Sequence, residues 1–183
     1  MSSRKNINDV KIAISGKSGC GNTTVSRLVA DALDLRFINY TFRVLAQEKG
    51  LSLKKILELA ETDDSWDNEV DTHQVELARK EGGCVLGSRL AIWMLPEADL
   101  KVYLFADPET RAKRIHNREG GPLSRTREFT NMRDRQDKDR YRRIYNIDSD
   151  DYSFADLIVD TNKIGPAAIA EVIISELHKR FSR

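Results

Sequence analysis

A glycine-rich segment stands between a short β-branched strand pattern and a helical pattern, and this order constrains the fold more than any other part of the sequence. The strand pattern covers residues 10–15, the segment reads Gly16-Lys17-Ser18-Gly19-Cys20-Gly21-Asn22-Thr23-Thr24, and the helical pattern covers residues 23–33. The glycines allow a tight turn in which successive N–H groups point inward, and the following helix adds its positive end. The segment therefore predicts an anion site at the edge of a sheet, with polyphosphate as its natural ligand.

Short β-branched or apolar runs alternate with longer helical patterns along the whole chain. Strands are expected at residues 10–15, 36–39, 84–87, 100–105 and 157–160. Helices are expected at residues 23–33, 41–49, 53–61, 66–80, 108–118, 124–145 and 166–180. Such alternation predicts an α/β fold, with a five-stranded parallel sheet wrapped by helices. A length of 183 residues suits a single domain, 1–183.

The composition excludes several classes of protein. The 30 basic and 29 acidic residues nearly cancel, so no global field selects a nucleic acid as partner. Cys20 and Cys84 lack a metal-ligand spacing and indicate a reducing compartment. No apolar run approaches the roughly 20 residues of a membrane span, and the start of the chain has no apolar signal-peptide core. We expect a cytoplasmic protein without nucleic-acid or membrane partners, either a monomer or a weak homodimer.

The glycine-rich segment matches the phosphate-loop pattern G-x-x-x-x-G-K-[ST] at every fixed position except the lysine, where Asn22 stands. The whole segment is assigned to nucleotide binding: Gly16, Ser18, Gly19, Cys20, Gly21, Asn22, Thr23 and Thr24. The Thr23 hydroxyl is expected to bind Mg²⁺. An amide cannot supply the charge that the usual lysine places on the β and γ phosphates.

Lys17 is one candidate for that missing charge. The segment resembles the loop of the deviant Walker A ATPases, G-K-x-G-x-G-x-T-T, in which an additional lysine occupies this position. The resemblance suggests that Lys17 acts on bound phosphate, within its own chain or on a partner subunit. The alternative is that Lys17 is a solvated loop residue and that arginines elsewhere compensate.

Further motifs resemble those of nucleoside monophosphate kinases, most closely the short, archaeal-like cytidylate kinases, from residue 10 to about 177. They are Asn39-Tyr40-Thr41-Phe42-Arg43, Asp71-Thr72-His73-Gln74 and Gly87-Ser88-Arg89-Leu90-Ala91-Ile92-Trp93. The resemblance implies that Arg43 and Arg89 grip the phosphate of an acceptor nucleotide, which suits the planar fork of arginine. It suggests Asp71 or Gln74 for base recognition. Gly87-Ser88 replaces the acid and glycine that relatives often carry, so an acidic Mg²⁺ partner is not expected there.

A second group of motifs resembles the lid of the same kinases. Glu119-Gly120-Gly121-Pro122 offers a hinge after a helix with Arg114 and Arg118, which are assigned to nucleotide binding. The next helix matches the spacing Arg-x-x-x-Asp-x-x-Arg at Arg133, Asp137 and Arg140, which places the three on one helical face. The resemblance implies that Arg133 and Arg140 act in catalysis with Lys17. Asp137 would bind the acceptor sugar or hold an arginine.

Together these resemblances imply transfer of the γ-phosphoryl group of MgATP to CMP or dCMP, with CDP or dCDP and ADP as products. They divide the domain into a core (8–40 and 82–183), an acceptor-binding helical region (41–81) and a lid (119–145). One alternative is a nucleotide-binding regulator that lost turnover with the lysine. Another is an RNA-binding module that uses residues 124–143, where eight basic residues are interleaved with four acidic ones.

Overall fold

The computed structural model describes residues 7–80 and 82–181 and forms one five-stranded parallel sheet. The first six residues, on which part of the signal-peptide expectation rests, lie outside the described ranges. The strands are β1 (Lys11–Gly16), β2 (Arg36–Ile38), β3 (Cys84–Gly87), β4 (Leu100–Phe105) and β5 (Leu157–Asp160), in the order β2-β3-β1-β4-β5. The α/β fold and all five expected strands are therefore confirmed.

The helices are α1 (Asn22–Leu33), α2 (Phe42–Lys49), α3 (Leu53–Ala60), α4 (Ser65–Arg79), α5 (Ala91–Met94), α6 (Pro108–Glu119), α7 (Leu123–Tyr145) and α8 (Pro166–Phe181), after a 3-10 turn at Ile7–Asp9. The seven expected helices are all present, to within two residues at each end. Sequence patterns did not predict the 3-10 turn or α5, because each is a single turn that is too short to show a periodicity.

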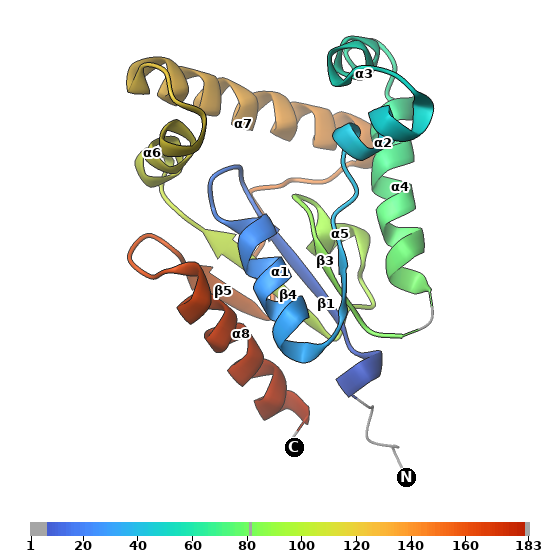
Figure 1. Cartoon of the computed structure of the whole chain (residues 1–183), viewed down its shortest axis with the longest axis vertical. Helices are drawn as coiled ribbons and strands as arrows, with labels where there is room; N and C mark the ends of the chain where they lie inside the picture. Colours follow the sequence, from blue (N-terminus) through green and yellow to red (C-terminus); the bar gives the residue numbers. More distant parts are fainter. Residues whose placement is uncertain (1–6, 81, 182–183) are drawn as a thin grey trace.

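Two apolar cores cover the two faces of the sheet. Side chains such as Ile12, Ile14 and Val102 pack against α1 and α8, which lie together on one face (Figure 1). Ala13, Leu86 and Tyr103 point to the opposite face and pack against α4 and α5. Residues that alternate along β1 therefore serve opposite cores, as expected for a strand buried on both sides. This packing fixes the carboxyl ends of β1, β3 and β4 at one edge of the sheet.

The helices α2, α3 and α4 share a third, smaller core of their own, made by Tyr40, Leu45, Ala46, Ile56 and Val70. The helices α2 and α3 start at side-chain caps, since Thr41 and Ser52 accept hydrogen bonds from the backbone of the first turn. The helix α7 runs across the carboxyl edge of the sheet, from α6 at one end to the α2 to α4 region at the other (Figure 1). The phosphate loop, α7 and the α2 to α4 region therefore all lie at the carboxyl edge of the sheet (Figure 1).

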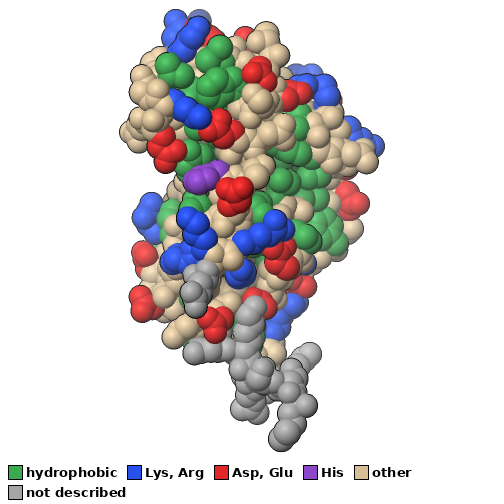
Figure 2. Space-filling view, turned by 90° about the vertical axis from the view of Figure 1, so that its right-hand side faces the viewer, with side chains coloured by type: hydrophobic (Ala, Val, Ile, Leu, Met, Phe, Trp, Pro, Cys, Tyr) green, Lys and Arg blue, Asp and Glu red, His purple; other side chains and the backbone are tan. Residues whose placement is uncertain are grey.

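The surface shows no dominance of one charge on the face that carries α3 and α4, where basic and acidic side chains are interspersed (Figure 2). This agrees with the net charge of +1. Within residues 7–80 and 82–181, no helix combines the length and apolar character needed to cross a membrane.

Candidate active site

The phosphate loop, residues 16–24, joins β1 to α1, and side chains from other parts of the chain hold its backbone in place. Arg111 Nη1 donates to the Ser18 carbonyl at 3.1 Å, and Arg114 Nη1 donates to the Gly19 carbonyl at 3.3 Å. Thr161 Oγ1 donates to the Cys20 carbonyl at 3.3 Å. Three successive carbonyl groups are therefore bound on the outer side of the loop.

The inner side of the loop presents unpaired donors. Within the described part of the chain, the N–H groups of Ser18, Gly19 and Gly21 have no acceptor. Gly21, at φ 92°, caps α1 without a side-chain hydrogen bond, so the first amides of the helix are also unpaired. Gly19, at φ 87°, lies so close to Arg111 that a Cβ would stand 2.8 Å from the Arg111 carbonyl oxygen. The loop has the form of a cradle for an anion at a helix N-terminus.

Asn22, at the position of the usual lysine, is turned toward the sheet. Its Nδ2 donates to the carbonyl groups of Ile14 at 3.0 Å and Ser88 at 3.2 Å, and its Oδ1 accepts from Ser26 Oγ at 3.0 Å. A Cβ on Gly87 would lie 2.6 Å from Ser26 Oγ, so glycine makes room for this arrangement. The side chain of Asn22 thus ties β1 to the segment after β3.

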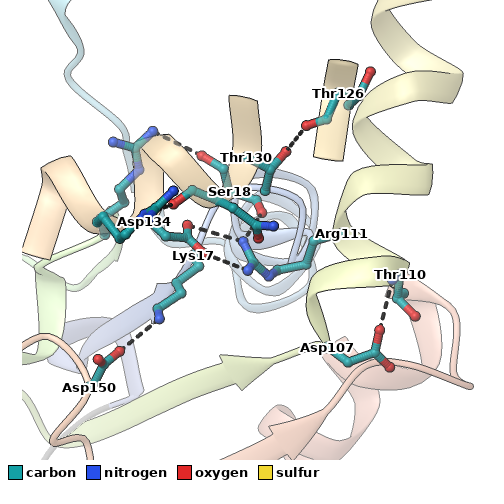
Figure 3. Close-up of polar contacts among 12 residues, drawn as sticks. Lys17, Ser18, Asp107, Thr110, Arg111, Thr126, Thr130, Asp134 and Asp150 are labelled. Carbon is teal, nitrogen blue, oxygen red and sulfur yellow. Dashed lines mark hydrogen bonds and ion pairs between the residues drawn. The ribbon is translucent and has the colours of Figure 1, made fainter. Parts of the chain in front are cut away.

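Lys17 extends from the same loop to the segment that follows α7. Its ammonium group pairs with Asp150 at 2.7 Å (Figure 3). Lys138 of α7 pairs with the other oxygen of that carboxylate at 2.6 Å. These two lysines lower the pKa of Asp150, Lys138 having the larger effect. The Lys17 side chain is half-buried, and its ion-pair partner among the described residues is Asp150.

Two arginines that the sequence assigned to different roles meet at one carboxylate. Asp137 is buried, and its two oxygens accept from Arg89 Nη1 at 2.7 Å and from Arg140 Nη2 at 2.8 Å. Arg89 also donates to Ser18 Oγ at 2.9 Å, which joins the cluster to the phosphate loop. Asp137 therefore holds arginines, one of the two roles expected for it. A pocket opens here, lined by Lys17, Arg89 and Asp137 among others.

Arg133 lies one helical turn before Asp137 on the same face of α7. No hydrogen bond or ion pair joins its guanidinium to any described residue. Partial burial and the nearby positive charge of Arg89 lower its pKa. Arg133 lies near the positive charge of Arg89 and forms no ion pair with a described residue. A bound anion would therefore stabilise its charged form.

Arg111 and Asp134 are functional candidates that the sequence analysis missed. Arg111 is 2% exposed, and its guanidinium forms two hydrogen bonds with the Asp134 carboxylate in addition to the one with Ser18 (Figure 3). It therefore links α6, the phosphate loop and α7. The only signal in the sequence was the spacing of arginines along residues 108–118, which does not distinguish a buried arginine from an exposed one.

The other expected lid arginines have different surroundings. Arg114 is held by the Gly19 carbonyl and by Thr161, through both the hydroxyl and the carbonyl oxygen. Arg118 is exposed and pairs with its neighbour Glu119. Arg114 thus supports the loop, whereas Arg118 stands at the end of α6, away from that contact.

Two further acceptor-side residues lie on α2 and α4. Arg43 is exposed in the first turn of α2, without a hydrogen bond or ion pair to any residue within 7–80 or 82–181. Asp71 accepts from Tyr145 Oη at 2.8 Å and from Gln74 Nε2 at 3.3 Å. Burial raises its pKa to about 6, against the opposing effect of the Tyr145 hydrogen bond.

Thr23 is the metal ligand that the sequence predicts. Its hydroxyl is exposed at the mouth of the loop and accepts from Asn39 Nδ2 at 3.3 Å. The described residues contain no group of three or more His, Cys, Asp or Glu that could hold a metal ion. One hydroxyl with several waters fits Mg²⁺, which is usually held by few protein ligands and by phosphate oxygens.

Comparison with known proteins agrees with this geometry. A model of the cytidylate kinase-like family matches residues 11–163. The chain belongs to this family. It is 48% identical to cytidylate kinase 2 of Borreliella burgdorferi over 175 residues, covering 93% of this chain and 97% of that protein. It is 40% identical to the cytidylate kinase of Archaeoglobus fulgidus, over 90% of this chain and 93% of that protein. The chain is thus a nucleoside monophosphate kinase by family.

Solved structures show the same fold at low sequence identity. A shikimate kinase from Bacteroides thetaiotaomicron superposes with a TM-score of 0.63 at 14% identity, covering 95% of this chain and 99% of that one. A deoxyadenosine kinase from M. mycoides with bound dATP gives a TM-score of 0.56 at 16% identity, over 92% and 100% of the two chains. The phosphate-loop kinase fold expected for this family member is confirmed.

Proposed function

We propose that this family member transfers the γ-phosphoryl group of MgATP to CMP or dCMP. The observation that carries the proposal is that the unpaired loop amides lie next to a cluster of three arginines, Arg89, Arg133 and Arg140. Relatives named cytidylate kinase, 48% and 40% identical over nearly the whole chain, support the acceptor. Such a site needs two phosphate-bearing ligands, because the loop takes one and the arginines outside it take another.

In this proposal each part of the chain has one task. The loop amides and Arg114 position the donor phosphates, and bound MgATP supplies the transferable group while the metal offsets phosphate charge. Thr23 is the protein ligand for that metal. Arg43 and Arg89 hold the acceptor phosphate, and Arg133 and Arg140 stabilise the charge that develops between the two. No general base is required, since positioning and charge neutralisation drive phosphoryl transfer.

The division into parts is also a proposal. Residues 41–81 form the acceptor-binding region, consistent with their own small core, and residues 119–145 form the lid. Closure of α7 would exclude water, which competes with the acceptor for the phosphoryl group. The Asn22 side chain is hydrogen-bonded to β1 and to the segment after β3. In this proposal Lys17 or Arg133 therefore provides the positive charge that the usual lysine would place on the phosphates.

The test is ADP release with MgATP and CMP, dCMP, UMP, AMP or GMP, beside a control without acceptor. Turnover that depends on CMP or dCMP is expected. Arg43→Ala and Arg89→Ala should mainly raise the KM for the acceptor, whereas Arg133→Ala should mainly lower kcat. Nucleotide binding without turnover for any acceptor would instead support the second candidate, a nucleotide-binding regulator without kinase activity. The structural role of Asn22, which leaves the loop without its usual lysine, favours that candidate.

A further inference from the structure

The outer strand β5 is buried on one face and open on the other. Val159 belongs to the core that α1 and α8 cover, whereas its neighbour Ile158, on the opposite face, is 47% exposed. The core on that second face is formed with α4 and α5, which contact β1, β2, β3 and β4, and it does not include Ile158. Strands of a parallel sheet are normally covered on both faces, so the open face of β5 indicates a missing partner.

The open face of β5 is part of a larger apolar surface. Phe105 is exposed and shares this face with Tyr103 and Ile158, because side chains alternate along a strand. Phe154 is also exposed and packs edge-on against Trp93, with ring centroids 5.7 Å apart, and Trp93 packs against Tyr103 in the same way at 6.2 Å. We call Phe105, Phe154 and Ile158 the β5 patch. Large apolar side chains gathered on one face in this way are typical of a protein interface.

Charges of opposite sign stand at the two ends of the β5 patch. Lys101 comes two residues before Tyr103 on β4, and Asp160 comes two residues after Ile158 on β5, so both share the face of the patch. The register pairs Tyr103 with Ile158, which places Lys101 toward the amino end of the strands and Asp160 toward the carboxyl end. The Asp160 carboxylate accepts from the Asn162 N–H at 2.9 Å. Neither Lys101 nor Asp160 forms an ion pair with a described residue, so both charges are available to a partner.

We propose that the β5 patch is the interface of a homodimer, in which two copies of this chain pack face to face about a twofold axis that runs across the strands. Such an axis reverses the strand direction in the second copy and sets Lys101 of one copy opposite Asp160 of the other. An axis parallel to the strands would set equal charges opposite each other, which is unfavourable. Asp156, a further charge at the amino end, is already paired with Arg180. The charge pattern therefore fits a second copy in one orientation, and the symmetric contact forms both ion pairs at once.

Sedimentation velocity of the full chain without nucleotide tests the dimer, over a range of about a hundredfold in protein concentration. The wild type is expected to shift toward twice the monomer mass as the concentration rises. Ile158→Glu places an unpaired charge in the middle of the interface and should raise the Kd of the dimer by at least about tenfold. Val172→Glu is the matched control, because Val172 is a similarly exposed β-branched residue on α8, and it should leave the Kd unchanged.

Exchange of the two charges tests the orientation of the copies. Lys101→Asp and Asp160→Lys should each weaken the dimer, because equal charges then face each other, and the double variant should restore the wild-type Kd. A double variant that dimerises no better than the single ones would overturn the proposed orientation. A wild type that stays monomeric at every concentration, or a dimer that Ile158→Glu does not weaken, would overturn the interface itself. Should Ile158→Glu not fold, Phe154→Ser removes another apolar side chain of the patch and should also weaken the dimer.

Discussion

Replacing Asn22 with alanine is expected to destabilise the protein by about 3 kcal/mol. The side chain makes three hydrogen bonds, two to the carbonyl groups of Ile14 and Ser88 and one from Ser26. Each is worth about 1 kcal/mol net, and the carbonyl groups left behind lie in a partly buried place. For a chain of this size the melting temperature should fall by about 6 to 12 °C.

Thermal unfolding without nucleotide, followed by circular dichroism, measures this effect. Ser26→Ala is a graded control, because it removes only the third hydrogen bond and should cost about 1 kcal/mol. Asn22→Lys is informative as well. A lysine cannot repeat the amide contacts beside Gly87, so the same stability should be lost even if the added charge raises turnover. An alanine variant that melts no lower than Ser26→Ala would refute the structural role of Asn22.

Three further predictions concern the site. Arg133→Ala should lower kcat by at least tenfold in steady-state assays with little change in melting temperature, since no described residue loses a partner; a large loss of stability would contradict this. Lys17→Ala should lower turnover, whereas Asp150→Asn, which frees Lys17, should not; equal losses would mean that the ion pair itself is needed. Asp71→Asn should stabilise the protein at pH 7 to 8 by up to about 3 kcal/mol but not at pH 4. Burial raises the pKa of Asp71 to about 6, so the native state prefers its protonated form, and its ionisation costs wild-type stability as the pH rises from about 4 through 6. Urea unfolding at both pH values checks this, and a gain that is equal at both would contradict it.

Local patterns were sufficient for the elements of the fold. The strand at residues 84–87 matched because glycines bound its apolar run. Asp107 and Pro108 mark the start of α6, where the Asp107 carboxylate accepts from the Thr110 N–H at 2.8 Å. The glycine-rich pattern correctly predicted a loop between β1 and α1. Elements of a single turn, such as α5, leave no periodic signal.

Side-chain partners across the chain were not predictable. Arg111 and Ser18 are 93 residues apart, and Lys17 and Asp150 are 133 apart. Spacing along one helix placed Arg133, Asp137 and Arg140 on one face but could not show that Asp137 would hold two arginines and leave the first without a partner. Such pairings depend on how helices pack, which a single sequence does not specify.

The placement of α7 has a consequence for how the two nucleotides bind. Its first half contacts α6 through Arg127 and Asp134, and its second half contacts α4 through Arg140, Arg143 and Tyr145. A continuous helix of 23 residues transmits a shift at one end to the other. In the proposed function, a donor nucleotide that moved the first half would also move the second half on the acceptor side. By thermodynamic linkage we then expect each nucleotide to change the affinity for the other by the same factor, so that α7 would couple the two proposed sites within a single chain.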